Sequence, residues 1–133
     1  MKKKTLFFTC CLLFAIKGSC QEKISLPSLA PEKEFENILS RKIAGDSLST
    51  GFVIWIKKEV KSHKHLRHSE TIYFIEGEGI MKMGETSITM KAGDYLFIPA
   101  GTVHSLKVTS STPVKVLSVQ SPEFNGDDRV FSE

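Results

Sequence analysis

Cysteine is absent from the chain beyond residue 20, because Cys10, Cys11 and Cys20 all lie in the N-terminal segment. A domain built from the remaining residues therefore needs no disulfide, even in an oxidising compartment. The same absence excludes thiol catalysis and thiolate metal sites in that domain.

Strong net charge is also lacking once the first twenty residues are set aside. The 133 residues include 18 Lys and Arg and 15 Asp and Glu, a formal charge of +3, but four of those lysines lie in the first twenty residues and no acid does. The rest of the chain carries a formal charge of about −1, so we expect no nucleic-acid partner bound through bulk positive charge. No glycine-rich run leads into a helix or carries a Lys-Ser/Thr pair, which excludes a phosphate loop.

The N-terminal segment has the composition of an export signal. Three lysines at residues 2–4 precede an apolar run over residues 6–16, and small residues follow at 18–20. This order is typical of a secretory signal peptide, and the run is shorter than the about 20 apolar residues of a membrane span. We predict a signal peptide over residues 1–20, no stable transmembrane segment after cleavage, and a secreted or periplasmic protein. A retained anchor helix is the alternative.

Cys20 leaves a further possibility open. A cysteine after Gly18 and Ser19 resembles a bacterial lipoprotein signal, in which that cysteine is lipidated, but Lys17 stands where such signals usually carry an aliphatic residue. We favour ordinary cleavage after Cys20, which would make Gln21 the new terminus. The alternative is a membrane-anchored lipoprotein.

The remaining chain has the pattern of an all-β domain. Residues 21–35, with Pro27 and Pro31, are interpreted as an N-terminal arm or linker, and residues 32–39 could form one or two helical turns. Residues 36–120 are predicted to form a single β-barrel or sandwich, because short segments rich in β-branched and aromatic residues alternate with turn residues. Residues 121–133 are predicted to be a polar tail, in which Phe124 and Phe131 could pack. Strands are expected at 51–58, 71–75, 80–83, 87–90, 95–98, 104–109 and 113–119, and turn glycines at 77, 79, 84, 93 and 101.

The four histidines carry the clearest chemical signal. His63, His65 and His68 fall within six residues, and His104 stands alone downstream. On a strand, residues two apart share a face, so His63 and His65 would point the same way. Three imidazoles together with Glu70 would suit a borderline divalent metal ion. Four protein ligands would leave two positions of an octahedral shell open for water, oxygen or a substrate.

The spacing of these residues resembles the first motif of the cupin superfamily. That motif runs His-x-His, three or four residues, Glu, six residues, Gly. This chain has His63 and His65, four residues, Glu70, six residues and Gly77. Lys57 stands where the motif often begins with glycine, a position that is not a metal ligand in the family.

A second cupin motif follows after fifteen residues. It runs Gly, five residues, Pro-x-Gly, two residues, His, and is matched by Gly93, Pro99, Gly101 and His104. Val108 stands where the motif often ends with asparagine, again not a ligand position. Because both motifs match in order and spacing, the resemblance covers close to half of the predicted domain.

The resemblance implies a fold, a ligand set and an assembly. The fold is the family's β-barrel, called the double-stranded β-helix or jelly roll. The ligands are His63, His65, Glu70 and His104, which would hold one divalent metal ion inside the barrel. Mn, Fe, Ni, Zn and Cu all suit these ligands, so the metal is not identified. A homodimer is also expected, since cupins often pair through strands.

Other residues near the motifs allow more than one interpretation. His68 could be a proton shuttle or a substitute ligand, but we expect a loop histidine at the barrel mouth. Tyr73 lies three residues after Glu70, and alternation places it on the opposite face. A basic stretch could attract an anionic ligand, although a solvated strand edge is the simpler interpretation. That stretch consists of Lys57, Lys58, Lys61, Lys64 and Arg67.

Three functions remain open from the sequence. The first is a small exported metal-dependent enzyme that oxygenates, decarboxylates or isomerises a small oxygen-rich molecule. The second is a non-enzymatic module that uses the metal to bind or sense such a molecule. The third is a structural barrel with adventitious metal. No catalytic residue beyond the metal ligands can be named from the sequence, and a fold does not by itself fix a function.

Overall fold

The chain forms strands over most of its length. A computed structural model describes residues 23–132, and the predicted signal peptide lies outside them. Within this range the elements are η1 (Leu26–Ser28), a short 3₁₀-helix, and the strands β1 (Ile38–Gly45), β2 (Thr50–Ile56), β3 (Glu59–His65), β4 (Ser69–Glu76), β5 (Glu78–Met83), β6 (Thr86–Lys91), β7 (Tyr95–Ile98), β8 (His104–Val108), β9 (Val114–Ser121) and β10 (Arg129–Phe131).

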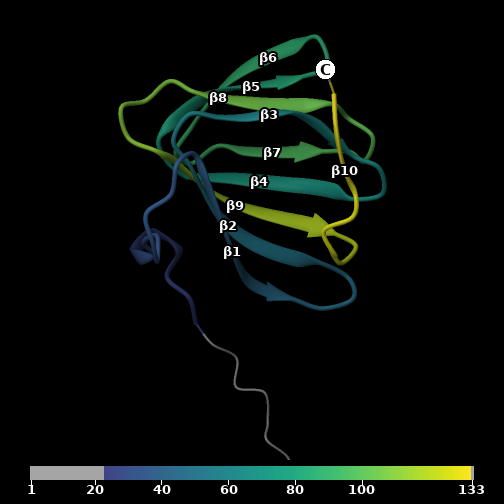
Figure 1. Cartoon of the computed structure of the whole chain (residues 1–133), viewed down its shortest axis with the longest axis horizontal. Helices are drawn as coiled ribbons and strands as arrows, with labels where there is room; N and C mark the ends of the chain where they lie inside the picture. The colour runs from purple at the N-terminus through teal and green to yellow at the C-terminus, as the bar shows by residue number, and fades with distance from the viewer. Residues whose placement is uncertain (1–22, 133) are drawn as a thin grey trace, which may run out of the picture.

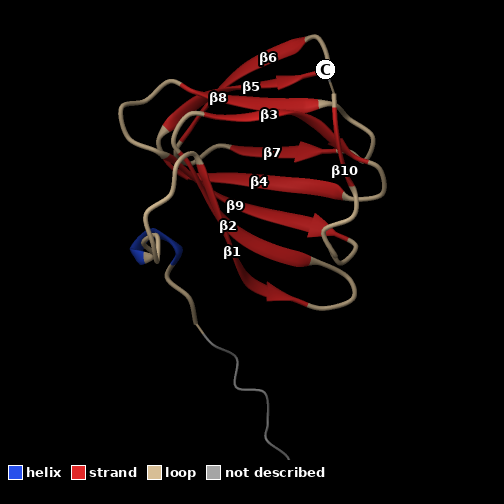
Figure 2. Cartoon of the chain, viewed as in Figure 1, coloured by secondary structure: helices blue, strands red, loops and turns tan. Residues whose placement is uncertain are grey.

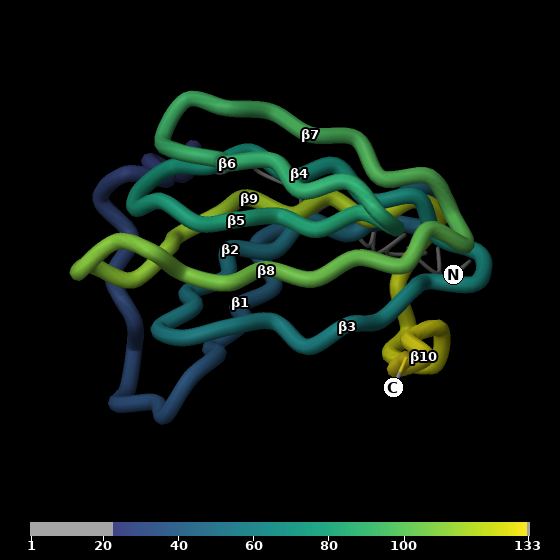
Figure 3. The backbone as a smooth tube through the Cα atoms, turned by 90° about the horizontal axis from the view of Figure 1, so that it is seen from above, coloured from purple at the N-terminus to yellow at the C-terminus, as the bar shows by residue number. Residues whose placement is uncertain are grey.

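These strands form two five-stranded antiparallel sheets (Figures 1 and 2). One sheet has the order β1-β2-β9-β4-β7 and the other the order β10-β3-β8-β5-β6. The chain crosses repeatedly between the sheets, with β3 in one and β4 in the other, and Figure 3 shows the strands of the two sheets overlying one another when seen from above. The prediction of an all-β jelly-roll barrel is confirmed.

The inner faces of the strands change from polar to apolar along the barrel. In β4, Glu70 is followed on the same face by Ile72 and Phe74, and all three are buried. Other strands repeat this order: His104 precedes Leu106 in β8, and β9 runs the opposite way from Val114 and Val116 to Ser118 and Gln120. A fully buried apolar side chain stabilises a fold by about 1.5–3 kcal/mol. The apolar end therefore supplies the stability, and the polar residues collect at the other end.

The N-terminal arm lies against the outside of one sheet. Lys115 of β9 is buried there, and its Nζ donates hydrogen bonds to the Pro27 carbonyl and to Glu76 Oε1, both at 2.9 Å. The prediction of helical turns over residues 32–39 is wrong, because this segment bends and then enters β1 at Ile38, which pairs with Ile56. No helix of residues 23–132 is long and apolar enough to span a membrane.

The prediction of a turn at Gly79 is also wrong. Gly79 lies inside β5, whereas Gly77, with a φ of 78°, is a turn glycine as expected. A Cβ at residue 79 would lie 2.8 Å from the Lys107 carbonyl oxygen and 2.7 Å from Leu106 Cδ1. Glycine is required at residue 79 because β8 approaches it closely, a usual reason for a glycine inside a strand.

The C-terminal segment joins the barrel. Strand β10 pairs with β3, with Arg129 opposite His65 and Phe131 opposite His63. In Figure 1 it crosses the end of the barrel at which β9 ends. Phe124 also packs, with its ring 6.0 Å from that of Phe52. Residues 121–132 thus cover the polar end of the interior and are more than a tail.

Candidate metal centre

The fold brings the four predicted ligands together at the polar end of the barrel. His63 and His65 come from β3, and His104, the first residue of β8, lies directly opposite His63 in the strand register. Glu70 reaches the cluster from β4 in the facing sheet. All four side chains are buried, with exposed fractions of 2–5%. One ring nitrogen from each histidine lies within 4.8 Å of the other two.

The carboxylate of Glu70 faces the imidazoles. Its Oε2 lies 3.3 Å from His104 Nε2 and 3.6 Å from His65 Nε2. The ring centroids of His63 and His104 are 4.3 Å apart, and those of His63 and His65 are 5.3 Å apart. Nitrogen and oxygen donors therefore converge from both sheets on one small volume.

Backbone carbonyl groups orient two of the imidazoles. His63 Nδ1 donates to the Lys61 carbonyl at 2.8 Å, and His104 Nδ1 donates to the Thr102 carbonyl at 2.8 Å. In a neutral ring a protonated Nδ1 leaves Nε2 with its lone pair, the form that ligates a metal. Such hydrogen bonds from ligand histidines to backbone are a usual feature of metal sites.

Buried nitrogen atoms without partners show that the cluster fits a metal ion. Among residues 23–132, three buried ring nitrogens have no hydrogen-bond partner: Nδ1 and Nε2 of His65 and Nε2 of His104. Buried polar atoms are nearly always paired, since leaving one unpaired is costly. Three imidazoles and one carboxylate are donors that divalent transition metals and zinc accept.

Two residues of β9 hold the far oxygen of Glu70. Its Oε1 accepts hydrogen bonds from the Ser118 hydroxyl and from Gln120 Nε2, the latter at 3.4 Å. Burial alone would raise the pKa of Glu70, but the nearby His104 and His65 imidazoles and the Ser118 hydroxyl outweigh it and hold the pKa well below its usual range. The carboxylate is therefore ionised, as a metal ligand must be. Sequence reasoning missed Ser118 and Gln120.

Protonation of His63 should make the metal-free protein less stable in mild acid. Burial, with smaller electrostatic contributions from His104, Arg129 and His65, lowers the pKa of His63 from 6.5 to about 4. Between these values the unfolded chain binds a proton that the folded chain does not, so stability falls as the pH drops through this range. Urea unfolding at a series of pH values measures this, and His63→Gln should show a flatter profile than wild type between pH 6.5 and 4. Parallel profiles would contradict the assignment.

A cavity of about 120 Å³ adjoins the cluster. His63, Glu70 and His104 lie at its polar end, and Phe124 and Arg129 of the C-terminal segment also line it. Its remaining wall is mostly apolar, with contributions from Ile54, Ile56, Val60, Ile72, Phe74, Met81, Leu106 and Val116. A small ligand could therefore reach the four candidate metal ligands while resting against hydrocarbon side chains.

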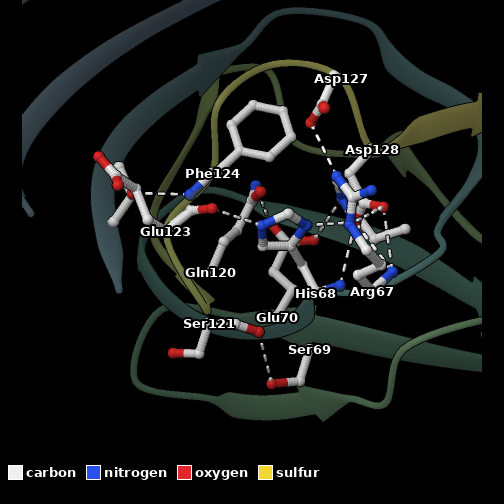
Figure 4. A network of polar contacts seen from close by, with 12 residues as sticks. Arg67, His68, Ser69, Glu70, Gln120, Ser121, Glu123, Phe124, Asp127 and Asp128 are labelled. Carbon is white, nitrogen blue, oxygen red and sulfur yellow. Dashed lines mark hydrogen bonds and ion pairs between the residues drawn. The ribbon is translucent and has the colours of Figure 1, made fainter. Parts of the chain in front are cut away.

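His68 lies in the loop between β3 and β4, as predicted, but it is buried and paired (Figure 4). Its Nδ1 donates to the Asp128 carboxylate, and its Nε2 donates to the Glu123 carbonyl at 2.7 Å. Burial lowers the pKa of His68, but these two hydrogen bonds raise it overall, and the pKa of Asp128 is lowered to about 2. Both ring nitrogens are thus engaged, and His68 is an ionic partner of Asp128.

Asp128 also holds the backbone of the loop that carries His68. Its carboxylate accepts hydrogen bonds from the backbone N–H groups of Arg67 and His68, each at 3.0 Å, and its carbonyl accepts one from the Leu66 N–H at 3.2 Å. Phe124 packs edge-on against His65, with ring centroids 5.8 Å apart. The C-terminal segment is thus fastened directly beside the candidate metal ligands.

Comparisons with known proteins agree with this architecture. Residues 52–120 match the model of the cupin domain. A quercetin 2,3-dioxygenase of Bacillus subtilis is 33% identical over 78 residues, which cover 54% of this chain and 23% of that protein. An oxalate-binding protein of Thermotoga maritima is 35% identical over 57 residues, which cover 43% of this chain and 47% of that protein. The match thus spans less than half the length of either relative.

The same fold is found in solved structures. A protein of Klebsiella pneumoniae with a double-stranded β-helix domain superposes with a TM-score of 0.72 at 20% identity, over 85% of this chain and 99% of the other. The family model covers more than half of the 133 residues, and the histidines and the glutamate of both cupin motifs lie together at the polar end of the barrel. The chain therefore belongs to the cupin family.

Proposed function

We propose that the protein binds one divalent metal ion through His63, His65, Glu70 and His104 and uses it to bind a small oxygen-rich molecule in the barrel cavity. The observation that carries this proposal is the group of buried nitrogen atoms of His65 and His104 that lack partners within residues 23–132, beside an ionised carboxylate. The cavity that opens on the same residues supplies the space for a ligand.

Residues of the chain prepare the site before any ligand arrives. The Lys61 and Thr102 carbonyls fix the rings of His63 and His104, and Ser118 fixes Glu70. When bound, a divalent metal ion would supply a Lewis acid that polarises an oxygen atom of the ligand. The apolar wall would exclude water from the remainder of the cavity.

Both an enzymatic and a binding role are compatible with this proposal. One relative is named for dioxygenation of quercetin and the other for binding oxalate. Among the residues that line the cavity, the ionisable side chains are His63, Glu70, His104 and Arg129. Three of these are candidate metal ligands, so the described part of the chain places no separate general base in the cavity wall, and we favour the binding role.

Export and pairing complete the proposal. The predicted signal peptide would direct the protein out of the cytoplasm, with lipidation at Cys20 as the alternative, and two copies would associate as in many cupins. The fate of the first twenty residues is tested by determining the N-terminus of the mature protein, and pairing by light scattering.

Spectroscopy of the cobalt-loaded protein tests the proposed function. Co²⁺ is added to metal-free protein, and the visible spectrum is followed during titration with oxalate and then with quercetin. We expect a saturable spectral change with at least one of them in wild type and in Lys64→Ala, a control on the opposite face of β3. Oxygen consumption with quercetin would reveal an enzyme. A spectrum unchanged by both ligands would contradict the proposal.

A further inference from the structure

Arg129 lies beside the candidate metal ligands in the pairing of β10 with β3. It lies directly opposite His65 in the antiparallel pair of β10 and β3, and Phe131 lies opposite His63. Side chains directly opposite one another in such a pair share a face of the sheet. The ring of Phe131 is accordingly 6.1 Å from that of His63. Arg129 therefore lies on the side of β10 that faces the cluster, and it lines the cavity.

The charge of Arg129 is not neutralised within the described part of the chain. No carboxylate among residues 23–132 forms an ion pair with its guanidinium, whereas nearby Arg67 pairs with Asp127 at 3.1 Å and with Asp128 at 3.8 Å. An exposed cation thus stands at the rim of a largely apolar cavity.

Asp128, the residue before Arg129, fixes the backbone at the start of β10. Asp128 is 1% exposed and binds the backbone of residues 66–68, and pairing with β3 continues through Phe131. The start of the Arg129 side chain is therefore fixed, and only the guanidinium end needs to move to meet a ligand. Such preorganisation lowers the entropy lost on binding.

We propose that Arg129 binds the carboxylate of a small ligand whose apolar part lies in the cavity. This inference rests on the proposed function, because the carboxylate that meets Arg129 would also supply the oxygen atom for the metal held by His63, Glu70 and His104. A guanidinium pairs with a planar carboxylate through two parallel hydrogen bonds. The volume of about 120 Å³ is close to that of cavities that accept a benzene-sized group. The expected ligands are therefore small monocarboxylates with an aromatic or branched aliphatic body.

Binding of benzoate and of its neutral analogue benzamide to the zinc-loaded protein tests this inference. Isothermal titration calorimetry is run on wild type, Arg129→Gln and Lys64→Gln, the last being a charge-matched control opposite Val130 on the outer face. Arg129→Gln should weaken benzoate binding by about ten-fold, the value of one hydrogen bond to a charged group. Its benzamide affinity, its zinc content and both affinities of Lys64→Gln should match wild type.

The outcomes separate this inference from the proposed function. Equal benzoate affinity in wild type and Arg129→Gln would overturn it, as would equal affinity of wild type for benzoate and benzamide, or the absence of saturable benzoate binding. Zinc content is measured on the same samples. If the samples contain no zinc but benzoate binding still depends on Arg129, the result would contradict the role of the metal. The same result would support the role of Arg129.

Discussion

Replacing His104 with alanine is expected to lower the affinity for a divalent metal by more than about 100-fold, beyond the loss seen when a mere partner of a ligand is removed. The Nε2 of His104 is buried, lacks a hydrogen-bond partner in the described part of the chain and lies 3.3 Å from Glu70 Oε2. Alanine removes one of three converging imidazoles and leaves the other two without a full coordination set. Competition with a chromogenic zinc chelator measures the affinity.

A matched substitution on the same strand controls for an unspecific effect of mutation. Lys107 lies on β8 three residues after His104 and is exposed, so Lys107→Ala should bind zinc as tightly as wild type. Circular dichroism establishes that both variants keep the strand content of wild type. A His104→Ala protein that folds and binds zinc with unchanged affinity would exclude His104 as a ligand.

Replacing Asp128 with alanine is expected to reduce the free energy of unfolding by about 3 kcal/mol, the cost of removing one partner of a buried pair. The carboxylate is buried and bonds to the ring of His68 and to the backbone N–H groups of Arg67 and His68. Loss of the carboxylate leaves these donors without their acceptor. Each buried donor that has no partner destabilises the folded state. Urea unfolding above pH 7 measures the change.

Asp127 provides the control, because it is the adjacent acidic residue. It pairs with Arg67 at 3.1 Å, but both side chains are mostly exposed, so Asp127→Ala should cost less than about 1 kcal/mol. Hydrogen exchange of the β10 amides should accelerate in Asp128→Ala alone, since Asp128 fastens the start of that strand. Equal stability of the two variants would show that the Asp128 pair does not hold the C-terminal segment.

The fold and the candidate ligands could be predicted from the sequence, because both leave patterns in short stretches of the chain. Alternating β-branched residues and turn residues mark the strands, and motif spacing nominated His63, His65, Glu70 and His104 without any structure. The structure then brings these four side chains together, because β3 and β8 pair with His63 opposite His104 and β4 faces them. That they bind metal stays a prediction.

Ser118 and Gln120 could have been found from the sequence. Both follow Val114 and Val116 at intervals of two, so alternation along β9 places two polar side chains on the inner face of the sheet. A polar residue at an inner position needs a partner, and Glu70 is the partner here. The pattern was present, but a search for motifs alone did not reveal it.

The role of the C-terminal segment could not be predicted in this way. Asp128 meets His68 across 60 positions of sequence, and β10 has only three residues. Neither periodicity nor a motif indicates so short a strand or so distant a pair. Gly79 is a similar case, because its requirement comes from the approach of β8 and not from a local turn. Contacts of this kind depend on the assembled barrel.

The most direct test of the central proposal is elemental analysis of the wild-type protein, purified without an affinity tag or chelator and, if necessary, after reconstitution. We predict about one divalent metal ion per chain, held by ligands that lose it when protonated at low pH. The identity of the metal would also narrow the function, with iron pointing to oxygenation and zinc to binding or Lewis-acid chemistry. A chain without metal after reconstitution with Mn, Fe, Co, Ni, Cu and Zn would contradict the account and make the buried histidines a metal-free cluster.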